Sequence, residues 1–389
     1  MIGILANIVA VFSIFALIYV FFLYPSLIRI LSIILNKPLE TNKDYKPELT
    51  VLISFYNEEK LIEDCIRSVY TSGYPKEKII VIAASDGSSD DSVRIVKELQ
   101  KEYRSLQLIE FGRSGKNKVL NKIAPLVQTE LLFYLDADSR PQIGALESMV
   151  LKFSDANVGA LISSLQFVNK LGENAGGQGE KIYQTYEGWI RDSESRIYST
   201  VNSLGSFYAI KKKYYKPLTN DLLADDFQPL LDVIEAGGRV IFDTDAITNE
   251  VRGKSLIDEC SRRVRTSAAG LSTLWHAKKL LSPVYGWTAF FLWSHKLLRW
   301  LSPCFLLLLL FSTAFMSYGT TFFYIIAILQ LVLYSFAFIG WILEKFSVNI
   351  FIFKMCLYFI TMNIGFFKGI IGFLSKKQNA LWDGHIIEE

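Results

Sequence analysis

The sequence has few of the residues that build zinc sites and disulfide frameworks. Its 389 residues include four cysteines, and no two of them form a C-x-x-C pair. Its three histidines include no H-E-x-x-H pattern. These absences argue against zinc ribbons, disulfide-stapled domains and zincin proteases.

Excess charge of either sign is also missing. The chain has 41 Lys and Arg against 38 Asp and Glu, a net charge of +3. Nucleic-acid-binding proteins normally carry a basic excess, so we expect no nucleic-acid partner. In contrast, 51% of the residues are hydrophobic, which is more than disordered chains or ordinary soluble chains of this size contain.

Two long stretches contain no charged side chain, residues 1–28 and residues 300–343. The first exceeds the ~20 residues that span a bilayer. It lacks the basic start and the small-residue cleavage site of a signal peptide, so we predict a retained anchor over residues 1–30. The second is long enough for two spanning helices joined by a turn at 317–321.

The remainder of the C-terminal part, within 301–375, is predicted to be transmembrane or interfacial. The apolar stretch 346–375 contains Lys354 and Lys368, so it is either a spanning helix or a re-entrant or interfacial one. Residues 281–300 look like an amphipathic interfacial segment, assigned to anchoring rather than catalysis. Its aromatic and cationic side chains are Tyr285, Trp287, Trp293, Trp300, His295, Lys296 and Arg299.

Residues 45–280 have the composition of one soluble α/β domain. Lys and Arg flank both of its ends, and the positive-inside rule therefore places it on the cytoplasmic side of a multi-pass protein of the cell (inner) membrane. Four spans would put the C-terminus outside, although Lys376 and Lys377 favour the inside. The flanking residues are Arg29, Lys37, Lys43 and Lys46, then Lys278, Lys279, Lys296 and Arg299.

Short apolar runs alternate with helical patterns in this domain, which predicts a parallel sheet covered by helices. The runs are residues 49–54, 79–83, 106–110 and 131–135, and residues 205–210 read as a further strand. In such sheets ligands bind beyond the carboxyl ends of the strands. Polar residues follow three of these ends. They are Tyr56, Asn57 (a good helix cap) and Glu58, then Asp86, then Asp136 and Asp138.

Asp136 and Asp138 are separated by one residue at a strand exit. Two close carboxylates repel each other unless a cation lies between them. Magnesium is bound in proteins by one or two carboxylates together with substrate phosphates. The alternative is a helix cap beside a solvated loop acid, but the strand context favours a metal site.

The other candidates each have a structural alternative. Asp86 either caps the next helix or accepts a hydrogen bond from a nucleobase. Lys116 is not part of a P-loop, because the glycine spacing is wrong and Asn117 follows it, yet it is able to contact a phosphate. Asp225 and Asp226 form a second acidic pair, which either begins a helix or supplies a general base.

Three arginines, Arg262, Arg263 and Arg265, come shortly before a membrane approach. They are either a positive-inside anchor or a phosphate clamp, since guanidinium groups match phosphate oxygens.

In this order, these residues resemble the membrane-bound family 2 glycosyltransferases, which have the GT-A fold. The resemblance covers roughly residues 48–300 and extends into the flanking membrane helices. It is strongest to cellulose, hyaluronan and poly-N-acetylglucosamine synthases. The matching pieces are residues 54–58 and 85–88, Gly115-Lys116 with Leu120-Asn121, 136–138, Gly205-Ser206, Asp225-Asp226 and 262–265.

The resemblance implies a Rossmann-like α/β GT-A domain that binds a nucleotide-sugar donor, expected to be UDP-linked, with Mg²⁺ or Mn²⁺. The donor-binding residues would be Tyr56, Glu58, Asp86, Lys116, Asp136, Arg262 and Arg265, with Glu58 and Asp86 at the base. Asp138 and Asp136 would bind the metal, and Asp226 with Asp225 would supply the catalytic base. Of the family's Q-x-x-R-W motif this sequence keeps only Arg265, since Arg262 and Thr266 replace the Gln and the Trp.

The expected reaction is a single in-line attack that inverts the anomeric carbon. Metal and arginines would neutralise the leaving diphosphate, and Asp226 would take the proton of the acceptor hydroxyl. The acceptor would be a glycan, as in a polysaccharide synthase, or a lipid carrier that receives one sugar, with membrane lipids around it. The weaker alternatives are an inactive nucleotide-sugar-binding scaffold and a transporter, which the charge-free 300–343 segment argues against.

Overall fold

A computed structural model describes residues 2–167, 175–219, 224–250, 255–314 and 321–375 of the chain. Its described strands form one mixed sheet in the order β3-β2-β1-β4-β7-β6-β8-β5. The strands are β1 (Leu49–Phe55), β2 (Ile79–Asp86), β3 (Leu106–Phe111), β4 (Leu131–Leu135), β5 (Ser139–Pro141), β6 (Val158–Phe167), β7 (Phe207–Lys211) and β8 (Arg239–Glu250).

The first four predicted strands are confirmed, and they are parallel to one another. The predicted strand near 205–210 is β7, which runs antiparallel to both β4 and β6. Asn57, however, is no helix cap. It has a positive φ of 54°, a conformation that Asn tolerates, and the next helix begins at Ile62.

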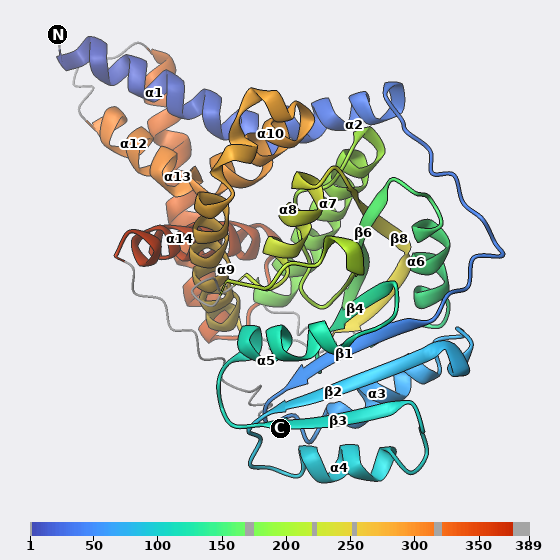
Figure 1. Cartoon of the computed structure of the whole chain (residues 1–389). Helices are drawn as coiled ribbons and strands as arrows, with labels where there is room; N and C mark the ends of the chain where they lie inside the picture. The colour runs from blue at the N-terminus through green and yellow to red at the C-terminus, as the bar shows by residue number, and fades with distance from the viewer. Residues whose placement is uncertain (1, 168–174, 220–223, 251–254, 315–320, 376–389) are drawn as a thin grey trace.

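Helices cover both faces of the sheet, each over its own apolar core (Figure 1). On one face lie α3 (Ile62–Tyr70), α4 (Ser92–Leu99) and α6 (Ala145–Phe153). On the other lie α5 (Lys116–Ile123), α7 (Ala175–Ile197), α8 (Phe227–Glu235) and α9 (Leu256–His276). The β1 strand alternates between these cores, since Leu49, Val51 and Ile53 pack on one side and Leu52 packs on the other.

The apolar segments form helices on the side of the sheet domain where α7 and α9 lie (Figure 1). They are α1 (Ile2–Ile18), α2 (Tyr24–Ile34), α10 (Trp287–Phe291), α11 (Leu298–Trp300), α12 (Ser302–Ala314), α13 (Thr321–Lys345) and α14 (Phe351–Leu374). Of these, α14 lies along α9 and α2 lies beside α7. Among the described residues, three helices are long and apolar enough to cross a membrane: Gly3–Ile34, Thr321–Lys345 and Phe351–Leu374. The pair Trp287–Trp300 and Ser302–Thr313, bent by 56°, is a fourth span or a re-entrant segment.

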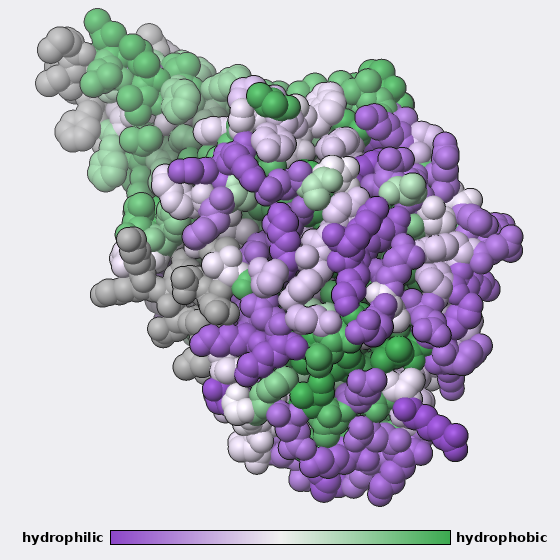
Figure 2. Space-filling view, viewed as in Figure 1, coloured by the Kyte–Doolittle hydropathy of each residue, from purple (hydrophilic) through white to green (hydrophobic). Residues whose placement is uncertain are grey.

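Apolar surface covers the membrane-helix end of the visible face, and a second apolar patch lies over the sheet near β1 and β2, while the rest of the sheet domain is mostly hydrophilic outside (Figure 2). The predicted turn at 317–321 falls mostly outside the described residues, but α12 and α13 flank it as expected. Helix α14 packs along α9, where Gly365 lies against Arg263 and Gly369 against Ser267. Small residues let two helix backbones approach closely.

Candidate active site

A pocket of about 390 Å³ opens between the carboxyl end of β4 and helices α7 and α9. Its walls include the start of α5, the segment before α8, and residues His295, Lys296, Arg299 and Trp300. This volume is within the range of small-molecule sites. Its place beyond a strand end is where open α/β sheets bind ligands.

Acidic side chains line one wall. Asp136, at the end of β4, lies 2.7 Å from the ammonium group of Lys116, the first residue of α5. The same ammonium lies 2.5 Å from a carboxylate oxygen of Asp225. Asp138 is buried on this wall and accepts a hydrogen bond from the Ser139 hydroxyl.

The ionisation of this wall is strongly perturbed. Burial, together with the neighbouring carboxylates, raises the pKa of Asp136 to about 7, even though Lys116 opposes the shift. Burial disfavours the charged form of Lys116, but Asp136 and Asp225 outweigh it and raise the pKa of this ammonium. Perturbed carboxylates in a cleft are typical of functional sites.

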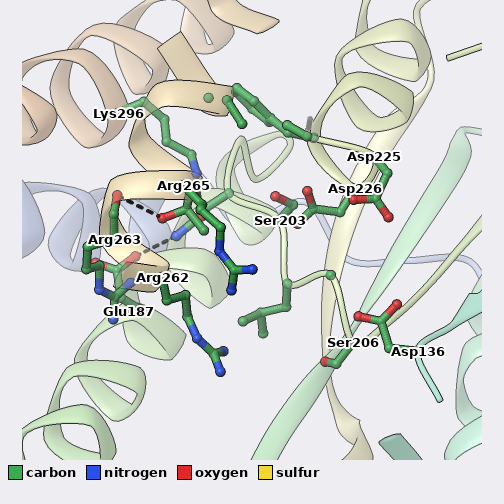
Figure 3. Close-up of a pocket in the computed structure, with 18 of the residues that line it drawn as sticks. Asp136, Glu187, Ser203, Ser206, Asp225, Asp226, Arg262, Arg263, Arg265 and Lys296 are labelled. Atoms are coloured by element: carbon green, nitrogen blue, oxygen red, sulfur yellow. Dashed lines mark hydrogen bonds between the residues drawn. The ribbon is translucent and has the colours of Figure 1, made fainter. Parts of the chain in front are cut away.

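Asp226 occupies the N-cap position of α8, but its side chain makes no capping hydrogen bond. The carboxylate lines the pocket instead, close to Ser203 (Figure 3). Burial and the charge of Asp225 raise the pKa of Asp226. Gly205 leaves room for it, since a Cβ there would lie 3.3 Å from an Asp226 carboxylate oxygen. The structural alternative for this acid, a helix cap, is therefore wrong.

Cationic side chains line the opposite wall. Ser255 and Asp258 form a capping box that fixes the start of α9. From this helix Arg262 and Arg265 project into the cavity that Asp136, Asp225 and Asp226 border (Figure 3). Arg262 also lies 3.4 Å from Glu250. The pocket thus presents carboxylates and guanidinium groups to one space.

Arg263 differs from the other two arginines because it is buried. Its guanidinium lies 2.6 Å from Glu180 of α7, and Tyr358 of α14 donates a hydrogen bond to the same carboxylate. This triad joins α7, α9 and α14. It fixes the helix that carries Arg262 and Arg265.

The acidic wall fits a divalent metal. Lys116 shows that the space between Asp136 and Asp225 accommodates a cation. In the described part of the chain, no group of three or more His, Cys, Asp or Glu residues has a metal-binding arrangement. Two carboxylates such as Asp136 and Asp138, together with ligand phosphates, are a donor set of the kind that holds Mg²⁺ in proteins.

Seven of the ten predicted site residues line this one pocket. They are Lys116, Asp136, Asp138, Asp225, Asp226, Arg262 and Arg265. Tyr56, Glu58 and Asp86 lie outside its described lining. Their proposed contacts with a nucleotide stay predictions.

Asp86 has a structural task that the sequence did not reveal. Its buried carboxylate accepts hydrogen bonds from the backbone N–H groups of Ser114 and Gly115, at 2.6 and 2.9 Å, and pairs with Arg113. The Arg113 guanidinium lies 3.6 Å from the centroid of the Tyr56 ring. Asp86 therefore holds the loop that leads into Lys116.

Helix α7 and residues 292–300 carry pocket residues that the sequence did not lead us to expect. The anchoring interpretation is wrong for His295 and Arg299, which are 1% and 3% exposed. The ring nitrogens of His295 lie 2.6 Å from Glu194 and 3.0 Å from Glu187. Arg299 pairs with Glu187 as well. Both residues line the pocket, and Lys296 does too.

The sequence did contain a signal for the charged residues of α7. Glu180, Glu187, Arg191 and Glu194 are spaced by seven, four and three residues, which places them on one face of a helix. Counter-charges on a second helix would then have been expected, and residues 295–299 supply them.

Comparison with known proteins now identifies the domain. Residues 50–213 match the model of "Glycosyl transferase family 2". These residues form a family 2 glycosyltransferase domain. The matched region includes β1 to β4 and β7, together with Lys116, Asp136 and Asp138, so the predicted family is confirmed for residues 50–213.

The chain is also similar to curated glycosyltransferases. The chain is 27% identical over 176 residues to a beta-monoglucosyldiacylglycerol synthase of Trichormus variabilis, which is 44% of this chain and 37% of that enzyme. It is 29% identical over 182 residues to a poly-beta-1,6-N-acetyl-D-glucosamine synthase of Staphylococcus aureus, 46% of this chain and 43% of that enzyme. The match thus spans less than half the length of these relatives.

The structural similarity extends further. The mannosyltransferase PcManGT from Pyrobaculum calidifontis, solved with GDP-Man and Mn²⁺, aligns with a TM-score of 0.74 at 20% identity. The alignment covers 97% of this chain and 100% of the other. The GT-A fold predicted for the family 2 domain is therefore confirmed, and the fold shared with PcManGT extends beyond this domain to nearly the whole chain.

Proposed function

We propose that this protein is an inverting glycosyltransferase of the cell membrane. It would move a hexose-type sugar from a nucleotide sugar, UDP-linked by our expectation, to a lipid-linked or glycan acceptor. One observation carries the proposal: Asp136 of the family 2 domain shares a pocket with Asp225, Asp226, Arg262 and Arg265, which follow this domain in the chain.

The donor would bind in the part of the pocket that offers both metal ligands and cationic side chains to its phosphates. We call this part, lined by Asp136, Asp138, Arg262 and Arg265, the donor end. Asp136 and Asp138 would hold Mg²⁺ or Mn²⁺, which when bound neutralises charge on the leaving diphosphate. Arg262 and Arg265 would bind the phosphate oxygens from the other wall. Lys116, released from Asp225 by the arriving phosphates, would bind them too.

Asp226 is the proposed catalytic base. It lies next to the acid wall, and its raised pKa makes it a better proton acceptor than an exposed aspartate. It would take the proton of the acceptor hydroxyl as that oxygen attacks the anomeric carbon. The sugar–diphosphate bond breaks at the same time, and the configuration of the carbon inverts.

The donor is identified by offering radiolabelled UDP- and GDP-sugars, with Mg²⁺ or Mn²⁺, to membranes that contain the full chain. Asp226→Asn should lower kcat by about 10²–10⁴-fold, the usual contribution of a general base, with donor Kd changed less than about threefold. A variant that binds donor and turns over normally would refute the base assignment. Absence of transfer from every donor would refute the proposed function.

The lipid-acceptor form of the reaction has its own support. Phe366 of the apolar helix α14 and Trp300 line the pocket together with the polar residues. The length of the labelled product separates the two forms, since single addition gives one lipid-linked sugar and a synthase gives a ladder of glycans.

A further inference from the structure

The inner end of the pocket holds a charged cluster that the proposed chemistry does not use. It consists of Glu187, Arg191 and Glu194 of α7 with His295, Lys296 and Arg299, and all of these except Glu194 line the pocket. Glu187 and Glu194 contact His295, Glu187 also pairs with Arg299, and Asp226 acts on Lys296 from the neighbouring acidic wall. Buried charge is costly when it is not compensated by a close partner, so an anion beside Arg191 and Lys296 would stabilise this end of the pocket.

Arg191 is the least compensated member of the cluster. It is 3% exposed, and its Nε has no hydrogen-bond partner among the residues that the structure describes. Among the described residues, the polar partners of its terminal nitrogens are Gln184, at 3.4 and 3.5 Å, and Glu187, at 3.9 Å, and the guanidinium lies 5.7 Å from the centroid of the Phe242 ring. These distances are beyond those of good hydrogen bonds. Burial accordingly lowers the pKa of this guanidinium.

Lys296 faces the same space. Its ammonium contacts the side-chain oxygen of Asn202 and lies 4.9 Å from the centroid of the Phe227 ring. In the described part of the chain it forms no ion pair within 4 Å. Phe227 directly follows Asp226, so an anion at Lys296 would lie beside the proposed base.

The cluster also borders the membrane helices. Arg299 donates to the carbonyl oxygen of Val20, and Tyr24 donates to Glu194, both within the apolar Gly3–Ile34 helix. This end of the pocket therefore lies on the side of the catalytic domain that packs against a membrane helix.

We propose that Arg191 and Lys296 form an anion-binding subsite for the phosphate group of a lipid acceptor. This inference rests on the proposed glycosyl transfer and specifies its acceptor class. The phosphate anchors the lipid, and a hydroxyl of the same head group then lies next to Asp226. The donor phosphates bind at the other end, between Asp136 and Arg265.

Binding is tested without catalysis, using the full chain in phosphatidylcholine nanodiscs. A saturating nucleoside diphosphate with Mn²⁺ fills the donor end, and phosphatidic acid is the probe. Phosphatidic acid should raise the Tm by about 5 °C, the stabilisation expected for near-saturating binding. Arg191→Met and Lys296→Met should lose most of this rise. Arg196→Met, an exposed arginine on the same helix, is the matched control and should keep it.

The outcomes are distinct. No rise in the wild type, or a full rise in both Met variants, overturns the subsite. An equal rise with inorganic phosphate overturns the lipid as its ligand. A rise in Tm with the nucleoside diphosphate alone confirms that each variant folds. If Arg191→Met fails this check, Arg191→Lys replaces it, and a partial rise in Tm with phosphatidic acid is expected. This experiment measures binding and not sugar transfer. If no radiolabelled donor supports transfer, the proposed function is refuted, while the binding of phosphatidic acid is judged separately.

Discussion

Asp226 and Asp225 make the proposed proton transfer dependent on pH. Burial and the adjacent negative charge both raise the pKa of Asp226. A base works only in its ionised form, so activity should be constant above this pKa and fall as the pH drops through it. The acid limb should therefore lie above the range of an ordinary aspartate, near 3.9.

Asp225→Asn tests this coupling. Removing the neighbouring charge should lower the pKa of Asp226 and move the acid limb of kcat/KM to lower pH, by roughly one unit. The profile is measured with labelled donor. Asp232→Asn, on α8 beside Lys216, is the control and should leave the limb in place. An unchanged limb in Asp225→Asn would show that Asp226 is not the titrating group.

Site residues near the ends of parallel strands could be predicted from the sequence. Lys116 and Asp136 through Asp138 lie near strand ends, and a parallel sheet brings such ends together. Asp86 also follows a strand, but its carboxylate is used by the backbone of residues 114–115. Arg191 and Lys296 do not follow strands, so the sequence did not predict them as site residues. They line the same pocket because α7 packs against residues 292–300.

The α9–α14 contact determines where the arginines of the cationic wall stand. At Gly369 an added Cβ would clash with the Ser267 hydroxyl and lie 2.9 Å from the carbonyl oxygen of Val264. At Gly372, one turn further on, the nearest atom is the Ala268 Cβ at 3.8 Å. Only the first position requires glycine for close packing.

Gly369→Ala should therefore destabilise the protein by about 1–3 kcal/mol, the range for overpacked sites, and raise the donor KM by displacing Arg262 and Arg265. Gly372→Ala is the matched control and should behave as wild type. Thermal unfolding in detergent and donor KM report the two effects. Equal behaviour of both variants would mean that α14 does not position α9.

In the sheet, β1 to β4 and β7 could be predicted from the sequence, but the direction of β7 could not. The β1 to β4 strands are short and apolar, and a helix separates each from the next, so their parallel pairing was predictable. The β7 strand has the same composition, and nothing local marks it as antiparallel. Its direction is set by pairing with β4 and β6, which are distant in sequence.

The arrangement of α14 bears on how the whole protein crosses the bilayer. Its residues Tyr358 to Gly369 contact α7 and α9 of the catalytic domain. We therefore expect α14 to lie at the cytoplasmic interface, as the pocket-lining helix Trp287–Trp300 also does, with the chain entering the membrane from Ser302 onward. The C-terminus is then cytoplasmic, as Lys376 and Lys377 favour.

Cysteine labelling tests this topology in a background without the four native cysteines. A cysteine at Ser317, between α12 and α13, should react with a membrane-impermeant thiol reagent in intact cells. Cysteines at Lys43 and Val348 should react only after permeabilisation. The reverse pattern for Ser317 and Val348 would mean that α14 spans the membrane and that the bent pair re-enters.

The wall formed by Phe366, Trp300 and the Lys296 segment has a kinetic consequence. If the acceptor enters between these side chains, it diffuses in two dimensions, and the quantity that saturates the enzyme is its mole fraction in the bilayer. Adding inert phospholipid at fixed enzyme and acceptor amounts should then slow turnover, while diluting the whole suspension with buffer should not.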